Sequence, residues 1–267
     1  MRSLDPPRAR LTADVAGGYF GYIRPWNVDR FETAVASIGV TLPSGVGVWA
    51  GAGFAQAHLR YAAQDFWQAN PVAGMTYGAR KTYVGASASW LFTSAEEIQH
   101  TKVLAAYADY AEVWFGGGLG LSSSIYPDLL VLVAHPRLHI ASGKNVRATV
   151  GAKLTLLRGE PDTAQNGTEF LPSGTAALSW VLGSRLTLSG GGFAGPQAYT
   201  VSDGGLWVWA SSDRFAGGYF VGGAVVIGKK ASYTLGASFS HRFGQSQAGL
   251  AHDFQILGGT ITGSAAF

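Results

Sequence analysis

The chain has 267 residues, a formal net charge of +3 and no cysteine. Charged residues make up 13% of it, against about 25% in ordinary soluble proteins, whereas hydrophobic residues make up 47%. The small and scattered positive charge argues against a nucleic-acid partner. The absence of cysteine excludes disulfides and cysteine-ligated metals.

The apolar content is not organised as transmembrane helices. The longest unbroken apolar run, Leu129 to Ala134, is far shorter than the roughly 18 residues that a membrane-spanning helix needs. The chain is rich in glycine (38 residues) and in aromatic residues (8 Trp, 11 Tyr and 14 Phe), which favours strands and turns. We therefore predict an all-β fold: a transmembrane antiparallel up-and-down β-barrel whose strands turn alternate residues toward lipid.

The first half of the chain is predicted to hold five strands, over residues 11–24, 31–42, 46–62, 81–92 and about 104–110. In the first, Phe20 and Tyr22 fall on the same face as Asp14. In the third, the alternation is interpreted as Trp49 and Tyr61 facing lipid, with His58 and Arg60 in the lumen. Residues 63–79 are expected to form a long loop. For the fifth strand we prefer the register that keeps Asp109 in the lumen, because a carboxylate facing lipid is costly.

The second half begins with residues 115–126, whose Gly/Ser-rich composition predicts a loop. His135, Arg137 and His139 share the inward face of the next strand, residues 128–140. Arg147 and Lys153 alternate with aliphatic residues over 146–157, and residues 158–174 are expected to be a loop. The remaining strands are predicted over residues 175–182, 185–194, 206–210, 215–227 and 233–243.

Loop lengths support a closed barrel. Turns after the even-numbered strands are short and most loops after the odd-numbered ones are longer, as in bacterial barrels. We expect about 12 strands: a lead-in (1–10), a transmembrane barrel (11–243) and a C-terminal extension (244–267). The extension could instead supply two further strands, which would make 14. As a tail, it could bind a protein partner in the envelope.

The last predicted strand, Tyr233 to Phe243, has an apolar face with aromatic residues at both ends, which is typical of strands that cross both bilayer interfaces. It resembles the closing strand of bacterial outer-membrane β-barrels. The resemblance implies a location in the bacterial outer membrane, in contact with its lipid. Because MRSLDPPRAR has no apolar segment, we expect the signal peptide to be absent from this form of the chain. The alternative is an organellar porin.

Part of the chain resembles a narrower family. YPDLLVLVAHPRLHI (126–140), GAKLTLLRGEPD (151–162) and SGTAALSWVL (173–182) are similar to segments of the outer-membrane channel family associated with the MetA pathway of phenol degradation. In that family a Pro-Asp starts one strand and a Lys-x-Pro-x-Gly-Asp segment ends the next. Here Lys153-Leu154-Thr155 lacks the proline. The resemblance implies a channel for hydrophobic compounds, and no functional residue is transferred from it.

Two sets of candidate residues follow from the predicted strands. The pore-lining set is mostly basic: His58, Arg60, Asp109, His135, Arg137, His139, Arg147, Lys153, Arg185 and Arg242. The aromatic residues expected at the lipid interfaces are Tyr19, Trp49, Tyr61, Trp90, Phe92, Tyr233, Phe239 and Phe243. A basic lumen attracts anions, although the same side chains could simply fill a narrow barrel.

We therefore predict an outer-membrane channel for passive uptake of small solutes, either anions or small hydrophobic compounds. No cofactor or metal is expected, since His135 and His139 would lie about 13 Å apart on a strand. No enzyme is expected either, because Ser240 and His241 are adjacent and so lie on opposite faces. The alternatives are a non-transporting barrel subunit of an envelope complex and an outer-membrane lipid hydrolase.

Overall fold

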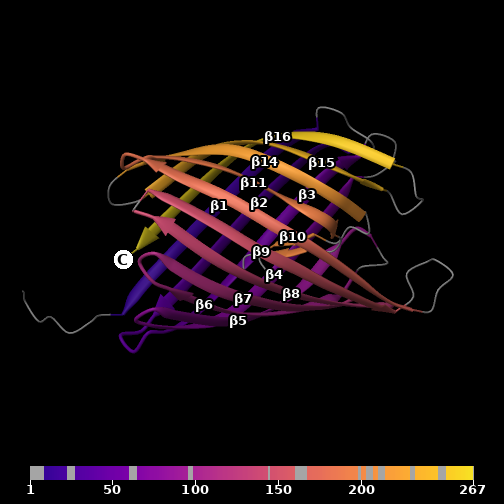
Figure 1. Cartoon of the computed structure of the whole chain (residues 1–267). Coiled ribbons are helices and arrows are strands. Elements are labelled where there is room, and N and C mark those ends of the chain that lie inside the picture. Colours follow the sequence, from indigo (N-terminus) through magenta and orange to yellow (C-terminus); the bar gives the residue numbers. More distant parts are fainter. Residues whose placement is uncertain are drawn as a thin grey trace, which may run out of the picture.

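The chain forms a closed barrel of antiparallel strands in a computed structural model (Figure 1). The structure describes residues 9–22, 28–59, 65–95, 99–143, 145–159, 167–197, 200–202, 207–209, 214–228, 232–245 and 251–266. This described part contains no helix long and apolar enough to cross a membrane.

The described residues contain sixteen strands. Those of the first half are β1 (Arg10–Tyr22), β2 (Val28–Thr41), β3 (Val46–Leu59), β4 (Phe66–Ala79), β5 (Thr82–Thr93), β6 (Thr101–Ala111), β7 (Phe115–Ile125) and β8 (Leu129–Ser142). Those of the second half are β9 (Val146–Gly159), β10 (Gly167–Leu182), β11 (Leu186–Gln197), β12 (Thr200–Ser202), β13 (Trp207–Trp209), β14 (Arg214–Ile227), β15 (Ser232–Gln245) and β16 (Ala251–Ala266).

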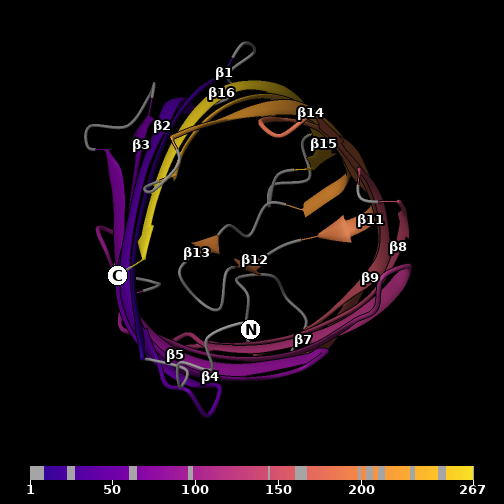
Figure 2. The ribbon, with the colours of Figure 1, turned by 90° about the vertical axis from the view of Figure 1, so that its left-hand side faces the viewer.

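Fourteen of these strands form the barrel, and β12 and β13 form a separate two-stranded sheet. Barrel strands that are consecutive in the chain are neighbours in the sheet. β11 pairs with β14, because β12 and β13, which come between them in the chain, are not part of the barrel. The barrel closes where β16 pairs with β1, from Thr12–Ala266 to Tyr22–Ile256. Viewed along the axis, β12 and β13 lie inside the ring of strands (Figure 2).

The alternation of each strand places apolar side chains outside. In β9, Val150 is half exposed on the outer face, while Lys153 and Thr155 on the inner face are buried. Exposed aromatic side chains form two outer belts, as bilayer interfaces select. The belt toward the right-hand end in Figure 1 contains Tyr19, Phe54, Trp67, Trp90, Phe92, Phe170, Tyr219 and Phe243, and the opposite belt contains Tyr77, Tyr110, Phe115, Trp180 and Tyr233.

The all-β barrel prediction is confirmed, with the larger of the two strand numbers that the sequence left open. The expected loop over 115–126 is wrong. Phe115, Leu119, Leu121 and Ile125 are exposed on the outer face of β7. The residues that alternate with them are small and face inward: Gly116, Gly118, Gly120, Ser122 and Ser124. The expected loop over 63–79 is likewise β4 for most of its length.

The C-terminal segment also differs from expectation. Gly244 and Gln245 still belong to β15, and residues 251–266 form the single strand β16. The segment is therefore neither a tail nor a pair of strands, and the binding of an envelope partner through it stays a prediction. Conversely, the strand expected near 206–210 is β13, which lies outside the barrel sheet.

A charged contact links two turns at the left-hand end of Figure 1. Lys81 in the β4–β5 turn forms an ion pair with Glu112, which follows β6, and the Tyr110 hydroxyl donates a hydrogen bond of 2.6 Å to Glu112. The hydrogen bond from Lys81 lowers the pKa of Glu112, and the same bond raises the pKa of Lys81.

We expect the substitution Lys81→Met to return the pKa of Glu112 toward its ordinary value. Because the pKa of Glu112 is lowered in the folded state, its contribution to stability is complete above the ordinary carboxyl pKa and is lost as the pH falls through the lowered one. An NMR titration of the Glu112 carboxyl carbon in micelles measures the change. Arg80→Met in the same turn is the control, and an unchanged titration after Lys81→Met would contradict the prediction.

Candidate functional site

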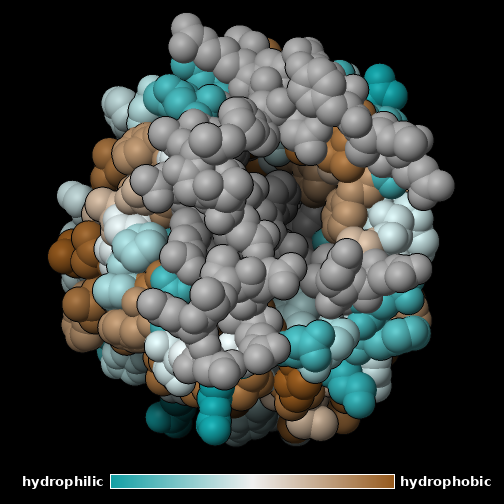
Figure 3. Space-filling view, turned by 90° about the vertical axis from the view of Figure 1, so that its right-hand side faces the viewer, coloured by the Kyte–Doolittle hydropathy of each residue, from teal (hydrophilic) through white to brown (hydrophobic). Residues whose placement is uncertain are grey.

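The inner face of the barrel holds two cavities of about 700 and 770 Å³. Both are lined by Asp109, His135, Arg137, Thr175 and Gln197, so they adjoin along these residues. The inward-facing Val103, Val131 and Thr155 have at most 1% of their surface exposed, so the inner face is closely packed around them. The right-hand end of the molecule is hollowed, with hydrophobic residues along part of the hollow (Figure 3).

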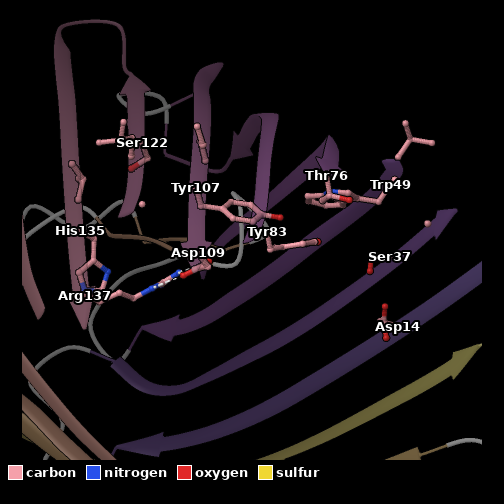
Figure 4. A pocket seen from close by; sticks show the side chains of 18 of the residues that line it. Asp14, Ser37, Trp49, Thr76, Tyr83, Tyr107, Asp109, Ser122, His135 and Arg137 are labelled. Atoms are coloured by element: carbon pink, nitrogen blue, oxygen red, sulfur yellow. Dashed lines mark hydrogen bonds and ion pairs between the residues drawn. The ribbon is translucent and has the colours of Figure 1, made fainter. Parts of the chain in front are cut away.

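An ion pair between Asp109 on β6 and Arg137 on β8 marks the junction of the cavities (Figure 4). Arg137 Nη2 lies 2.7 and 2.9 Å from the two carboxylate oxygens, and Nε lies 3.2 Å from Oδ1. The pair crosses the intervening strand at Gly118, the residue opposite both in the register. A Cβ at Gly118 would collide with Asp109 Oδ1 and lie 2.8 Å from Arg137 Nε. A side chain at this position would therefore displace the ion pair.

Basic side chains collect on one side of the lumen. His135, Arg137 and His139 alternate along β8, and Arg147 and Lys153 do so on the neighbouring β9. His139 Nδ1 lies 3.0 Å from Thr149 Oγ1, which fixes its ring against β9. Asp14 and Ser37 face the first cavity from β1 and β2, away from the basic strands (Figure 4). The lumen thus carries positive charge mainly on the β8–β9 wall.

The structure places most of the predicted pore-lining residues on the inner face: Asp109, His135, Arg137, His139, Arg147, Lys153 and Arg242. Arg185 lies in the turn between β10 and β11, at the end of the barrel, where its carbonyl accepts a hydrogen bond from Val226 N. Arg60 lies outside the described residues.

His58 is a correction, because it lies on the outer face of β3. Its Nδ1 lies 2.7 Å from Asp65 Oδ2, and its Nε2 lies 3.6 Å from Glu32 Oε1. The register pairs Arg30 with His58 and Glu32 with Gln56. These polar side chains form an outward group at the right-hand end of the strands, where headgroups replace lipid tails, so a charged side chain outside is tolerated.

Trp49 is a second correction, since it lines the first cavity rather than contacting lipid (Figure 4). It lies directly opposite Gly74 in the register, and a Cβ on Gly74 would come within 2.6 Å of Trp49 Nε1. The indole therefore rests over the glycine. Of the other expected interface aromatics, Tyr61 lies outside the described residues. The remainder lie on the outer face: Tyr19, Trp90, Phe92, Tyr233, Phe239 and Phe243.

The same arrangement recurs around the inner wall. Tyr107 lies opposite Gly85, Phe20 opposite Gly258, and Phe220 opposite Gly191. In each pair, a Cβ on the glycine would meet the aromatic ring at less than 3 Å. Aromatic rings that cover cross-strand glycines stabilise sheets. Here the glycines also let the rings lie close to the barrel wall.

Five inward apolar side chains line the second cavity but were not among the predicted site residues: Phe20, Phe31, Phe193, Phe220 and Ile256. The alternation over residues 11–24 does place Phe20 on the lumen face. It gives no sign, however, that rings from β2, β11 and β14 join it, because that depends on which strands are neighbours. The sequence could therefore place one of these residues in the lumen, but it could not predict that they form a group.

On the outer face of β15, His241 Nε2 lies 2.5 Å from Asp253 Oδ1, and His241 Nδ1 lies 3.3 Å from the Tyr219 hydroxyl. Ser238 and Ser240 line the second cavity on the opposite face of β15, so neither can serve as a nucleophile for His241. Within the described ranges, no group of three His, Cys, Asp or Glu residues could hold a metal ion.

Comparisons with known proteins relate the chain to others by fold. No protein-family model and no curated protein sequence matches the chain, so the resemblance to the MetA-pathway channels stays a prediction. Solved structures do match. OmpT of Vibrio cholerae is 9% identical with a TM-score of 0.53, over 99% of both chains. A bacterial polysaccharide outer-membrane secretin is 12% identical with a TM-score of 0.52, over 97% of this chain and 98% of that one.

This chain has the fold of bacterial outer-membrane β-barrels.

Proposed function

We propose that the barrel is a channel in the bacterial outer membrane through which small solutes diffuse, with a preference for anions. The observation that carries this proposal is the pair of adjoining cavities that meet at Asp109 and Arg137. Their volumes of about 700 and 770 Å³ are in the range of sites that hold small organic molecules. The outer aromatic belts and apolar strand faces support the membrane location.

The basic β8–β9 wall supports the anion preference. A lumen walled by low-dielectric protein and lined by one sign of charge raises the local concentration of the opposite ion. Lys153 and Arg147 are two residues of that wall on β9. In water, a unit charge about 5 Å from a permeating ion interacts with it by roughly 0.8 kcal/mol, or about fourfold in concentration. Salt reduces this effect.

Conductance in a planar bilayer under a potassium chloride gradient tests the proposal. We expect stepwise openings with a reversal potential on the chloride side. The double substitution Arg147→Gln and Lys153→Gln should shift that potential toward potassium, by up to about fourfold in permeability ratio for each charge. Arg158→Gln is the matched control, because Arg158 lies on the outer face of β9 and is exposed. A folded barrel that never conducts would refute the channel.

A further inference from the structure

The second cavity has an apolar wall with a charged group set into it. Following the barrel order, Phe193 comes from β11, Phe220 from β14, Ile256 from β16, Phe20 from β1 and Phe31 from β2. β15 lies in the middle of this series and contributes polar residues instead: Ser238, Ser240 and Arg242. A lumen wall exposed to water does not require this many aromatic residues, which favours a ligand with an apolar body.

Two rings of this wall rest on glycines of neighbouring strands. Phe20 lies over Gly258, and Phe220 lies over Gly191 with Cε1 2.9 Å from where a Cβ would be. The centroids of Phe20 and Phe31 are 6.3 Å apart with their planes tilted by 46°. The aromatic surface is therefore preformed, and a flat ring stacking on it would order few side chains.

Arg242 is positioned beside these rings by a third glycine. Gly218 lies between Phe193 and Arg242 in the register, and a Cβ there would come within 2.9 Å of Phe193 Cε1 and 3.2 Å of Arg242 Cγ. The Arg242 guanidinium carbon also lies 5.5 Å from the centroid of the buried Phe215 ring. This cation–π contact orients the planar donor group.

We infer that the second cavity binds an aromatic carboxylate, with the ligand ring against the phenylalanine wall and its carboxylate on Arg242. A guanidinium offers two parallel N–H donors that match a carboxylate. Ser238 and Ser240 supply further hydroxyl donors on the same strand, and His139 and Arg137 face the cavity from β8. The inference rests on the proposed channel function, since it names the substrate class of that lumen.

Calorimetry on the purified barrel in nanodiscs, with benzoate as the probe, tests the inference. Benzoate is expected to bind at least about tenfold more tightly than acetate, which lacks the ring, and than benzyl alcohol, which lacks the charge. Cyclohexanecarboxylate, equal in charge but not flat, should bind more weakly than benzoate. Equal affinity for benzoate and acetate would overturn the inference, and equal affinity for benzoate and cyclohexanecarboxylate would overturn its aromatic part.

Variants locate the site. Arg242→Met should weaken benzoate binding about tenfold and leave benzyl alcohol unchanged, while Arg242→Lys should restore part of the loss. Phe220→Leu should weaken benzoate and not acetate, with the outward-facing Phe243→Leu as its matched control. Unchanged benzoate affinity in a folded Arg242→Met barrel would overturn the assignment.

Conductance separates the two proposals. A barrel that conducts chloride but does not bind benzoate preferentially would contradict the ligand class alone. A barrel that binds benzoate but never conducts would contradict the channel alone. In a conducting barrel, benzoate should reduce the current, and Arg242→Met should remove that reduction.

Discussion

A chain that ends at Gln245 is expected not to form a barrel. Residues 251–266 form β16, which pairs with β15 from Ser232–Ser264 to Gln245–Ala251 and with β1 along its other edge. Their removal leaves two open edges, and each unpaired backbone group in lipid costs several kcal/mol. Summed over two edges, this loss exceeds the roughly 5–15 kcal/mol by which folded proteins are stable.

Heat-modifiable migration in gels and far-UV circular dichroism measure this outcome in lipid vesicles. The control is the double substitution Leu257→Ala and Ile261→Ala, which removes the large exposed side chains of β16 but keeps its backbone pairing. That variant should fold. A truncated chain that still folds and conducts would show that residues 251–266 are an accessory segment after all.

The substitution Gly118→Leu is expected to separate the Asp109–Arg137 ion pair. The added side chain would occupy the space through which the pair crosses β7. Overpacking alone costs about 1–3 kcal/mol. Separating the two charges adds to this cost. The addition is reduced by water, because each side chain is about 30% exposed. Urea unfolding in vesicles, followed by tryptophan fluorescence, measures the loss.

Gly117→Leu is the matched control, because the neighbouring glycine faces outward. A Cβ there would lie 3.3 Å from Arg137 O and 3.5 Å from Leu138 Cδ2, contacts that a small shift relieves. Equal destabilisation by the two substitutions would mean that the loss comes from replacing a glycine in β7, and that separating the ion pair adds nothing to it. A loss of stability confined to Gly118→Leu would show that it comes from disturbing the Asp109–Arg137 ion pair where it crosses β7.

The fold was predictable because lipid on one side and water on the other impose a two-residue period. β9 shows that period plainly, with Val150 outside and Lys153 inside. The period disappears where both faces carry small or apolar residues. β3 has Val48 and Phe54 on its outer face and Trp49 and Ala55 on its inner face, so polarity could not set its register.

β7 was missed as a barrel strand, and β16 was not predicted as a single strand, for a related reason. The inner positions of β7 are glycine and serine, and β16 has few large side chains besides Leu257 and Ile261. Such composition is also that of loops and tails. The basic residues of β8 and β9 were predictable, because charge is excluded from lipid. The grouping of Phe20, Phe193 and Phe220 depends on which strands become neighbours, which no local pattern encodes.

On the proposed channel function, the rings resting on glycines set the width of the passage. Trp49, Tyr107, Phe20 and Phe220 each lie over a residue without a side chain. Replacing such a glycine by alanine would tilt the ring toward the axis and narrow the bore, while the strand number and hydrogen-bonded register stay the same. Barrels of this architecture could therefore be altered in solute size limit one residue at a time, without rebuilding their walls.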